Sequence, residues 1–167
     1  SKVIFSAPFW DIHVSAGLKA YASLVSAFAP TIGLGAKRTP TTSSNAYIAL
    51  APYEGNFLTS DRASYDWMRD HVAKHPDLVV GGPSLGWLRE ALYEFRNFQK
   101  VAVPLPESLC FLGSEEKIVS PKAVQRSMAN WPNGELVVLQ GAKHEILMES
   151  PTILDAVWKR IFGFLAG

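Results

Sequence analysis

The fold is decided by two strand-and-loop stretches, LCFLGSEEKIVSP at residues 109–121 and LVVLQGAKHEILMESP at residues 136–151. Each begins with an unbroken apolar run, which is typical of a strand buried on both faces of a parallel sheet. Each ends in Ser-Pro, an N-cap residue followed by proline at the first position of a helix. This order of strands and helices predicts parallel strands with crossover helices, and therefore an α/β fold.

A third apolar run, Val3-Ile4-Phe5, predicts another core strand at the start of the chain. The two Ser-Pro signals predict helices from residue 121 to about 130 and from residue 151 to the C-terminus. The long interval after the first strand contains helical patterns and a loop rich in glycine, serine and threonine. Helices are predicted there at about residues 15–28, 64–73 and 85–98, and the loop at residues 33–45.

We interpret this interval as an inserted helical cap that lies over the strand ends, because no clear strand within it would pair with the sheet. The chain is therefore divided into a first core strand (residues 1–13), a helical cap or lid insertion (residues 14–100) and a C-terminal α/β core (residues 101–167).

The composition is that of a globular domain, since 48% of the 167 residues are hydrophobic and 19% are charged. A net charge of +1 provides no basic surplus, so we expect no nucleic-acid partner. No apolar run approaches the roughly 20 residues of a membrane-spanning helix. The single cysteine, Cys110, lies in an apolar run, which predicts a buried, inert thiol and no internal disulfide. With no secretory signal in view, we expect a cytoplasmic protein.

His144 follows shortly after the apolar run that ends at Leu139. Open α/β sheets carry catalytic groups in the loops at the carboxyl ends of their strands. Histidine has a pKa near neutral pH, so it can take a proton from a nucleophile while a carboxylate holds its other nitrogen. The alternative is a loop histidine without a chemical role.

Two carboxylates, Glu115 and Glu116, follow the preceding predicted strand and lie at the same edge of the sheet. A carboxylate there could orient His144 and stabilise its imidazolium, as the acid of a Ser-His-acid triad does. Alternatively, both are exposed loop charges with Lys117 as a surface partner. The position of His144 at the end of the next strand favours the triad interpretation.

Together, residues 112–121 and 139–149 resemble the acid and histidine loops of the α/β-hydrolase superfamily, and above all of its bacterial lysophospholipases and monoacylglycerol-lipase-like enzymes. The resemblance implies the C-terminal part of an α/β-hydrolase fold, with His144 as the catalytic general base. The family's acid, usually aspartate, stands three residues after a glycine, which places it at Glu116. Glutamate is a departure from that pattern, and Glu115 stays an alternative. No cofactor and no metal is implied.

The superfamily's nucleophile is a serine in a Gly-x-Ser-x-Gly elbow between a strand and a helix. The stretch Gly82-Pro83-Ser84-Leu85-Gly86 matches this pattern, but we assign Ser84 to a loop or to the N-cap of the following helix. Pro83 restricts the backbone where the elbow needs an unusual turn, and Leu78-Val79-Val80 would be a poor central strand. We therefore expect the nucleophile upstream of residue 1, and we expect this chain alone to be inactive.

The resemblance implies a serine hydrolase of a lysophospholipid, a monoacylglycerol or a similar lipid-like ester, with peripheral contact with the inner membrane. Two alternatives stay open: a non-catalytic binding or assembly module, and a compact hydrolase that uses Ser84. The strand at Val3-Ile4-Phe5 would have an unpaired edge, which we expect a missing N-terminal segment or another chain to cover.

The other histidines are weighed against simpler roles. His13 follows the first strand and could line the site, but a polar residue at the start of the cap is the simpler interpretation. His71 and His75 stand four residues apart on one predicted helix, which is a spacing that metal ligands use. No third ligand is evident beside them, so we expect no metal site.

Overall fold

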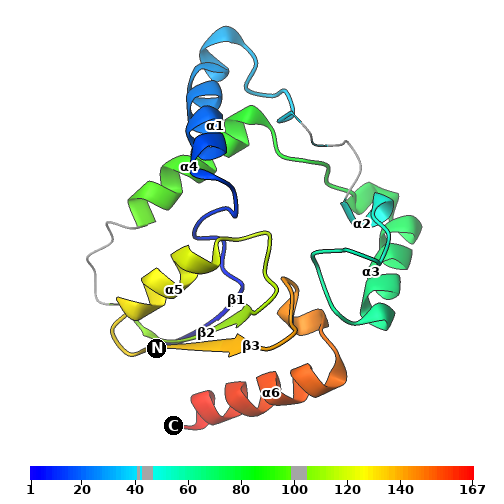
Figure 1. The fold of residues 1–167 in the computed structure, drawn as a ribbon, viewed down its shortest axis with the longest axis vertical. Coiled ribbons are helices and arrows are strands. Elements are labelled where there is room, and N and C mark those ends of the chain that lie inside the picture. Colours follow the sequence, from blue (N-terminus) through cyan, green and yellow to red (C-terminus); the bar gives the residue numbers. More distant parts are fainter. Residues whose placement is uncertain (41, 43–46, 99–104) are drawn as a thin grey trace. The chain divides into compact units, whose positions relative to one another are not determined.

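Three parallel strands form the central sheet: β1 (Lys2–Ser6), β2 (Glu107–Gly113) and β3 (Gly134–Leu139). They lie in the order β1-β2-β3 in the computed structural model, which describes residues 1–40, 42, 47–98 and 105–167. In the register, Ile4 lies opposite Leu109, and Leu109 lies opposite Glu135. The predicted α/β fold with three parallel strands is confirmed, and the loops that follow β2 and β3 begin at the same edge of the sheet (Figure 1).

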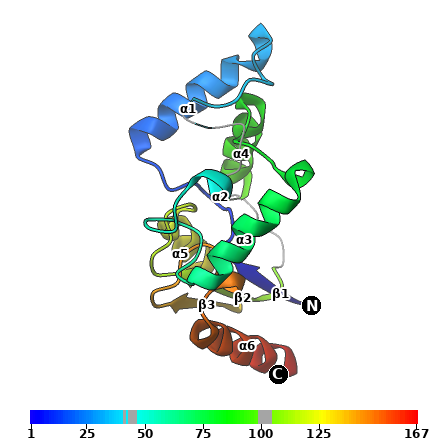
Figure 2. The same cartoon turned by 90° about the vertical axis from the view of Figure 1, so that its right-hand side faces the viewer.

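Two helices cover the sheet. Helix α5 (Pro121–Ala129) and helix α6 (Pro151–Ala166) lie on opposite faces, as Figures 1 and 2 both show. The hydroxyl of Ser120 accepts a hydrogen bond from the N–H of Ala123 at 3.3 Å, so the predicted N-cap of α5 is confirmed. The predicted side-chain cap at Ser150 is wrong, because its hydroxyl caps nothing. Helix α6 still begins at Pro151, whose fixed φ suits the first helical position.

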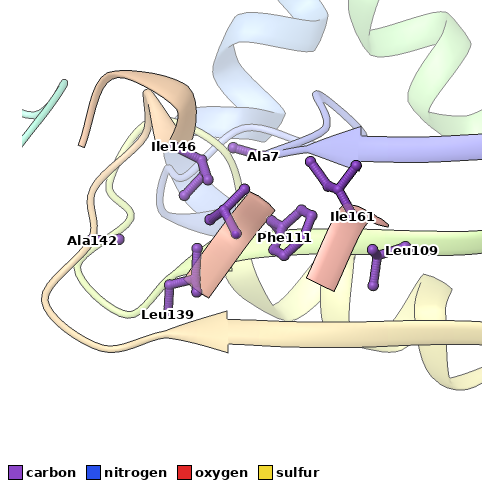
Figure 3. Close-up of a cluster of buried hydrophobic side chains, with 8 residues drawn as sticks. Ala7, Leu109, Phe111, Leu139, Ala142, Ile146 and Ile161 are labelled. Carbon is purple, nitrogen blue, oxygen red and sulfur yellow. The ribbon is translucent and has the colours of Figure 1, made fainter. Parts of the chain in front are cut away.

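The core of the sheet lies between β2 and α6 (Figure 3). Leu109 and Phe111 point to this side of β2, because side chains alternate along a strand. Burying each large apolar side chain of this kind contributes about 1.5–3 kcal/mol, so the cluster holds α6 to the sheet. Its buried members are Ala7, Leu109, Phe111, Leu139, Ala142, Ile146, Val157 and Ile161.

Cys110 and Leu112 point to the other face of β2, the face on which α5 lies, and both are buried. Burial raises the pKa of the Cys110 thiol to about 12, so the thiol stays protonated near neutral pH. The predicted burial of Cys110 is therefore confirmed.

The chain divides into two compact units. The first contains the sheet and comprises Ser1–His13, Tyr53–Trp67 and Ala102–Gly167; the second comprises Val14–Pro52 and Met68–Val101. The boundary that we predicted between residues 100 and 101 lies outside the described residues. The division into a strand, a cap and a core stays a prediction.

The second unit is helical, and the predicted helices near residues 15–28 and 85–98 are confirmed as α1 (Ala16–Phe28) and α4 (Leu85–Phe98). These two helices pack against each other (Figures 1 and 2). Helix α3 (Arg62–Lys74) begins in the first unit and matches the helix predicted at residues 64–73. Shorter helices, which the sequence pattern did not predict, occur at Pro30–Ile32 (η1), Tyr47–Leu50 (α2), Pro76–Leu78 (η2) and Ile146–Met148 (η3).

The loop predicted at residues 33–45 lacks helix and strand over residues 34–40 and at residue 42; its other positions from 41 to 45 lie outside the described residues. No helix within the described part of the chain is both long and apolar enough to cross a bilayer.

Candidate active site

The acid loop, residues 113–120, joins β2 to α5 and contains the buried carboxylate of Glu116. Its Oε1 accepts hydrogen bonds from the backbone N–H groups of Ile118 at 2.6 Å and Val119 at 3.1 Å. The loop is also tied to the chain after β1, since the N–H of His13 donates to the carbonyl of Ile118 at 3.1 Å. These contacts hold the carboxylate at the carboxyl edge of the sheet.

The histidine loop, residues 140–150, follows β3 at the same edge. It turns at Gly141, whose φ of 75° lies in the left-handed region that favours glycine. His144 follows three residues later, and the short helix η3 (Ile146–Met148) then leads to α6. Ile146 is fully buried in the core cluster, so its side chain anchors the loop two residues after the histidine.

The two loops bring His144 and Glu116 into direct contact. Nδ1 of His144 lies 2.8 Å from Oε2 of Glu116, and the side chains are 21% and 0% exposed, respectively. Glu115 is exposed and takes no part in this contact. Among the residues that the structure describes, none forms a hydrogen bond with Nε2 of His144. The two predicted site residues therefore meet, and the second ring nitrogen is left for another group.

Burial and hydrogen bonding oppose each other in setting the pKa values of this pair. Burial alone would raise the pKa of Glu116 and lower that of His144, because it disfavours both charged forms. Burial is the largest single cause at both groups, but the other causes together outweigh it: the mutual hydrogen bond, the two backbone N–H groups at Glu116, and the charges of Glu116 and Glu145 at His144. The pKa of Glu116 thus lies below its ordinary value and that of His144 above. The ionised carboxylate accepts a hydrogen bond from the N–H at Nδ1, and Nε2 of the neutral ring can then act as a base.

The two loops pack closely because residue 113 is glycine. A Cβ at Gly113 would lie 2.3 Å from the carbonyl oxygens of both Ala142 and Lys143, far inside van der Waals contact. Two cross-loop hydrogen bonds use this proximity: Gly141 N–H donates to Ser114 Oγ at 2.9 Å, and Glu115 N–H donates to Ala142 O at 3.0 Å. The short distance between Glu116 and His144 therefore requires that residue 113 has no Cβ.

A segment far away in sequence supports the histidine loop, and the sequence pattern did not predict this. Residues 53–61 pack in the same unit as the sheet. Leu58 O accepts a hydrogen bond from Glu145 N–H at 2.7 Å, and Thr59 Oγ1 donates to Met148 O at 2.7 Å. Glu149 is buried against the same segment. A second buried glutamate so close to the site carried no sequence signal, because one of its partners, Ser60, lies 89 residues away.

Ser84 lies in the second unit and has the contacts of a helix cap. Its hydroxyl accepts a hydrogen bond from the N–H of Trp87 at 3.1 Å at the start of α4. Leu78 ends the short helix η2, and residues 79–80 are not a strand, so the strand that a nucleophile elbow requires does not precede Ser84. The structure therefore agrees with the interpretation of Ser84 as an N-cap residue.

The remaining histidines take no part in the hydrogen bond between His144 and Glu116. The side chain of His13 is exposed, and only its backbone is bonded to the acid loop. The ring of His71, on α3, lies 4.7 Å from the ring of His75, which follows the end of that helix at Lys74. Within the described residues, no cluster of three or more His, Cys, Asp or Glu side chains could hold a metal ion.

The paired loops after β2 and β3 fit a known family of hydrolases. The Hydrolase_4 family model, described as serine aminopeptidase S33, matches residues 1–151. The chain belongs to this family.

Curated relatives of the chain include lysophospholipases. The probable lysophospholipase L2 of Haemophilus influenzae is 28% identical over 166 residues, which are 99% of this chain and 51% of that protein. Lysophospholipase L2 of Escherichia coli K12 is 28% identical over 121 residues, or 68% of this chain and 36% of that protein. The chain therefore spans about half the length of the first relative and less of the second.

Solved structures with the same fold include two lipases. Monoglyceride lipase from Saccharomyces cerevisiae aligns with a TM-score of 0.68 at 16% identity, over 98% of this chain and 54% of that one. Paleococcus ferrophilus monoacylglycerol lipase aligns with a TM-score of 0.67 at 16% identity, over 98% of this chain and 58% of that one. At this identity the likeness concerns the fold, which is that of the α/β-hydrolases.

Proposed function

We propose that the protein is a serine hydrolase of carboxylic esters, with a lysophospholipid, a monoacylglycerol or a similar lipid-like ester as its substrate. The observation that carries the proposal is the 2.8 Å contact between Nδ1 of His144 and the buried carboxylate of Glu116, with Nε2 left as a base. Membership of the hydrolase family and the two lysophospholipase relatives support the choice of substrate. A lipid-like substrate would bring the protein into peripheral contact with a membrane surface.

In the proposed mechanism, a serine hydroxyl attacks the ester carbonyl while Nε2 of His144 takes its proton. The resulting imidazolium is stabilised by Glu116, whose carboxylate keeps the other proton on Nδ1. His144 then donates its Nε2 proton to the leaving alcohol. In the second half, water attacks the acyl-enzyme as Nε2 takes its proton, and His144 returns that proton to the serine oxygen as the bond to the acyl group breaks and the carboxylic acid leaves. We assign the nucleophile to a serine upstream of residue 1, because the contacts of Ser84 are those of a helix cap.

The test is ester hydrolysis by the protein expressed from its complete gene, with lysophosphatidylcholine and a monoacylglycerol as substrates. We expect His144→Ala to abolish turnover and Glu116→Gln to lower kcat by about 10⁴-fold, as loss of the acid does in other triads. Glu115→Gln is the matched control, because that neighbouring carboxylate is exposed and should leave turnover unchanged. Near-wild-type turnover in His144→Ala would refute the proposed role.

A fluorophosphonate probe tests the position of the nucleophile. The 167-residue chain should not be labelled, whereas the protein from the complete gene should be labelled at an upstream serine. Labelling of the 167-residue chain that disappears in Ser84→Ala would assign the nucleophile to Ser84 instead.

A further inference from the structure

Glu149 is 1% exposed, and hydrogen-bond donors surround its carboxylate. Oε1 accepts from the backbone N–H of Lys143 at 2.7 Å and from that of Ser60 at 3.0 Å. Oε2 accepts from the same N–H of Ser60 at 3.1 Å and from the Ser60 hydroxyl. One buried side chain thus ties Lys143, the residue before His144, to Ser60, which lies 89 positions before Glu149 in the chain.

The segment that receives Glu149 is itself well braced. Asn56 is buried, and its Oδ1 accepts hydrogen bonds from the N–H groups of Leu58 at 2.8 Å and Thr59 at 3.0 Å. Its Nδ2 donates to the carbonyl of Tyr53 at 2.7 Å. Thr59 Oγ1 accepts from the N–H of Asp61 at 2.9 Å while it donates to the histidine loop. Residues 53–61 are therefore held in one conformation by their own hydrogen bonds.

The histidine loop needs such a support because Glu116 holds only the ring of His144. The backbone around His144 belongs to no long helix or strand, and its own N–H makes a long 3.4 Å contact with Phe57 O. Glu149 lies at the far end of the loop and reaches back to Lys143, so it closes the loop on itself as well as onto Ser60. A displacement of this backbone would move Nδ1 away from Glu116.

We propose that Glu149 is a positioning residue for His144, one that acts through the backbone of residue 143 and through Ser60; this inference rests on the proposed function. The charge of Glu149 is not what tunes the histidine, since Glu116 and Glu145 are the carboxylates that raise the pKa of His144. Glu149 supplies hydrogen bonds that hold the histidine loop where Nδ1 of His144 can reach the carboxylate of Glu116.

Two substitutions separate hydrogen bonding from charge. In Glu149→Gln, the amide oxygen can still accept from the N–H groups of Lys143 and Ser60, and the amide nitrogen can donate to the Ser60 hydroxyl. In Glu149→Met, an unbranched side chain of similar length removes both oxygen acceptors and leaves only a weakly accepting sulfur. The matched control is Glu135→Gln, an exposed carboxylate on β3 that pairs with Arg160.

The first readout is the pKa of His144, measured by NMR titration of the 167-residue chain and assigned among its four histidines with a His144→Gln variant. We expect Glu149→Met to lower this pKa toward the ordinary value, while Glu149→Gln and Glu135→Gln leave it unchanged. The second readout is ester hydrolysis by the protein from the complete gene. There Glu149→Met should lower kcat by about 100-fold with little change in KM, as a misplacement of about 1 Å can do, and Glu149→Gln should retain most of the rate.

The inference is overturned if folded Glu149→Met keeps the His144 pKa of the wild type, or if Glu149→Gln is as damaging as Glu149→Met. Should Glu149→Met fail to fold, Ser60→Ala decides, because it removes only the hydroxyl contact with Oε2. A smaller decrease in the His144 pKa then supports the inference, and an unchanged pKa overturns it. Absence of ester hydrolysis in the wild type would refute the proposed function alone, since the NMR titration requires no substrate.

Discussion

The acid loop and the histidine loop follow neighbouring strands, end at Ser-Pro and each contain a buried glutamate, but they are stabilised in different ways. Glu116 accepts from N–H groups two and three residues ahead of it, so its carboxylate is held within its own loop, although that loop also bonds to the chain after β1. Glu149 accepts from Lys143 and from Ser60, which lies 89 residues away. The carboxylate of the pair is therefore held by its own loop, whereas the histidine loop depends in addition on a segment that is distant in the sequence.

The largest expected effect comes from Gly113→Ala, which acts on both loops at once. The added methyl group would meet two carbonyl oxygens at 2.3 Å, and backbone cannot yield as a flexible side chain can. We expect a loss of about 3 kcal/mol in the free energy of unfolding, measured by urea denaturation. The control is Gly163→Ala in α6, where a Cβ meets nothing within 4 Å and the helix should gain up to about 1 kcal/mol. Equal stability of the two variants would contradict the close packing of the loops.

Thr59→Val should weaken the histidine loop alone. Valine has the same shape but leaves Met148 O without its donor and Asp61 N–H without its acceptor, at a fully buried position. We expect a loss of about 2 kcal/mol in the free energy of unfolding. In NMR spectra, amide shifts should change in residues 143–149 and stay constant at Ile118 and Val119. Changes that spread evenly over both loops would argue against their separate support.

The pH dependence of stability reports on the acid and the histidine separately. Because the folded pKa of Glu116 is lowered, its contribution is present above its unfolded pKa of about 4.3 and is lost as the pH falls through the folded value. Because the folded pKa of His144 is raised, its contribution is complete below about pH 6.5 and is lost as the pH rises through the folded value. The wild type should therefore exceed Glu116→Gln in stability most clearly between about pH 5 and 6. Urea midpoints from pH 3 to 9 measure this difference, and parallel curves would refute the coupling.

The smallest expected effects compare the two Ser-Pro ends of the loops. Ser120→Ala removes a hydroxyl that accepts from Ala123 N–H and should cost about 1 kcal/mol in the free energy of unfolding. Ser150→Ala removes a hydroxyl that caps nothing, so the change should be close to zero. Thermal unfolding of both variants provides the measurement, and a reversed order would show that the two helix starts have been misassigned.

The contrast between the loops also explains what could be predicted from sequence. The apolar runs predicted all three strands, and the Ser-Pro signals predicted both helix starts, because these features depend on neighbouring residues. The meeting of Glu116 and His144 followed from parallel strands whose ends share one edge. The residues themselves did not distinguish Glu116 from Glu115; the backbone N–H groups of Ile118 and Val119 do so in the structure.

The support by residues 53–61 could not be predicted in the same way. Glu149 has the sequence surroundings of an ordinary loop carboxylate, and nothing near it indicates that Ser60 is its partner. The equal Ser-Pro signals likewise hid the fact that only Ser120 uses its hydroxyl as a cap. Both features depend on which backbone groups the completed fold leaves without partners, and that is a property of tertiary structure.

The span of the contact between Glu149 and Ser60 has a consequence for the order of folding. Bringing together two points 89 residues apart costs about 3 kcal/mol more chain entropy than closing the two- and three-residue turns around Glu116. Contacts of such long range form late, after local structure has reduced the search. During refolding, Glu116 should therefore reach its final hydrogen bonds early, and the imidazole of His144 should be one of the last groups to become ordered.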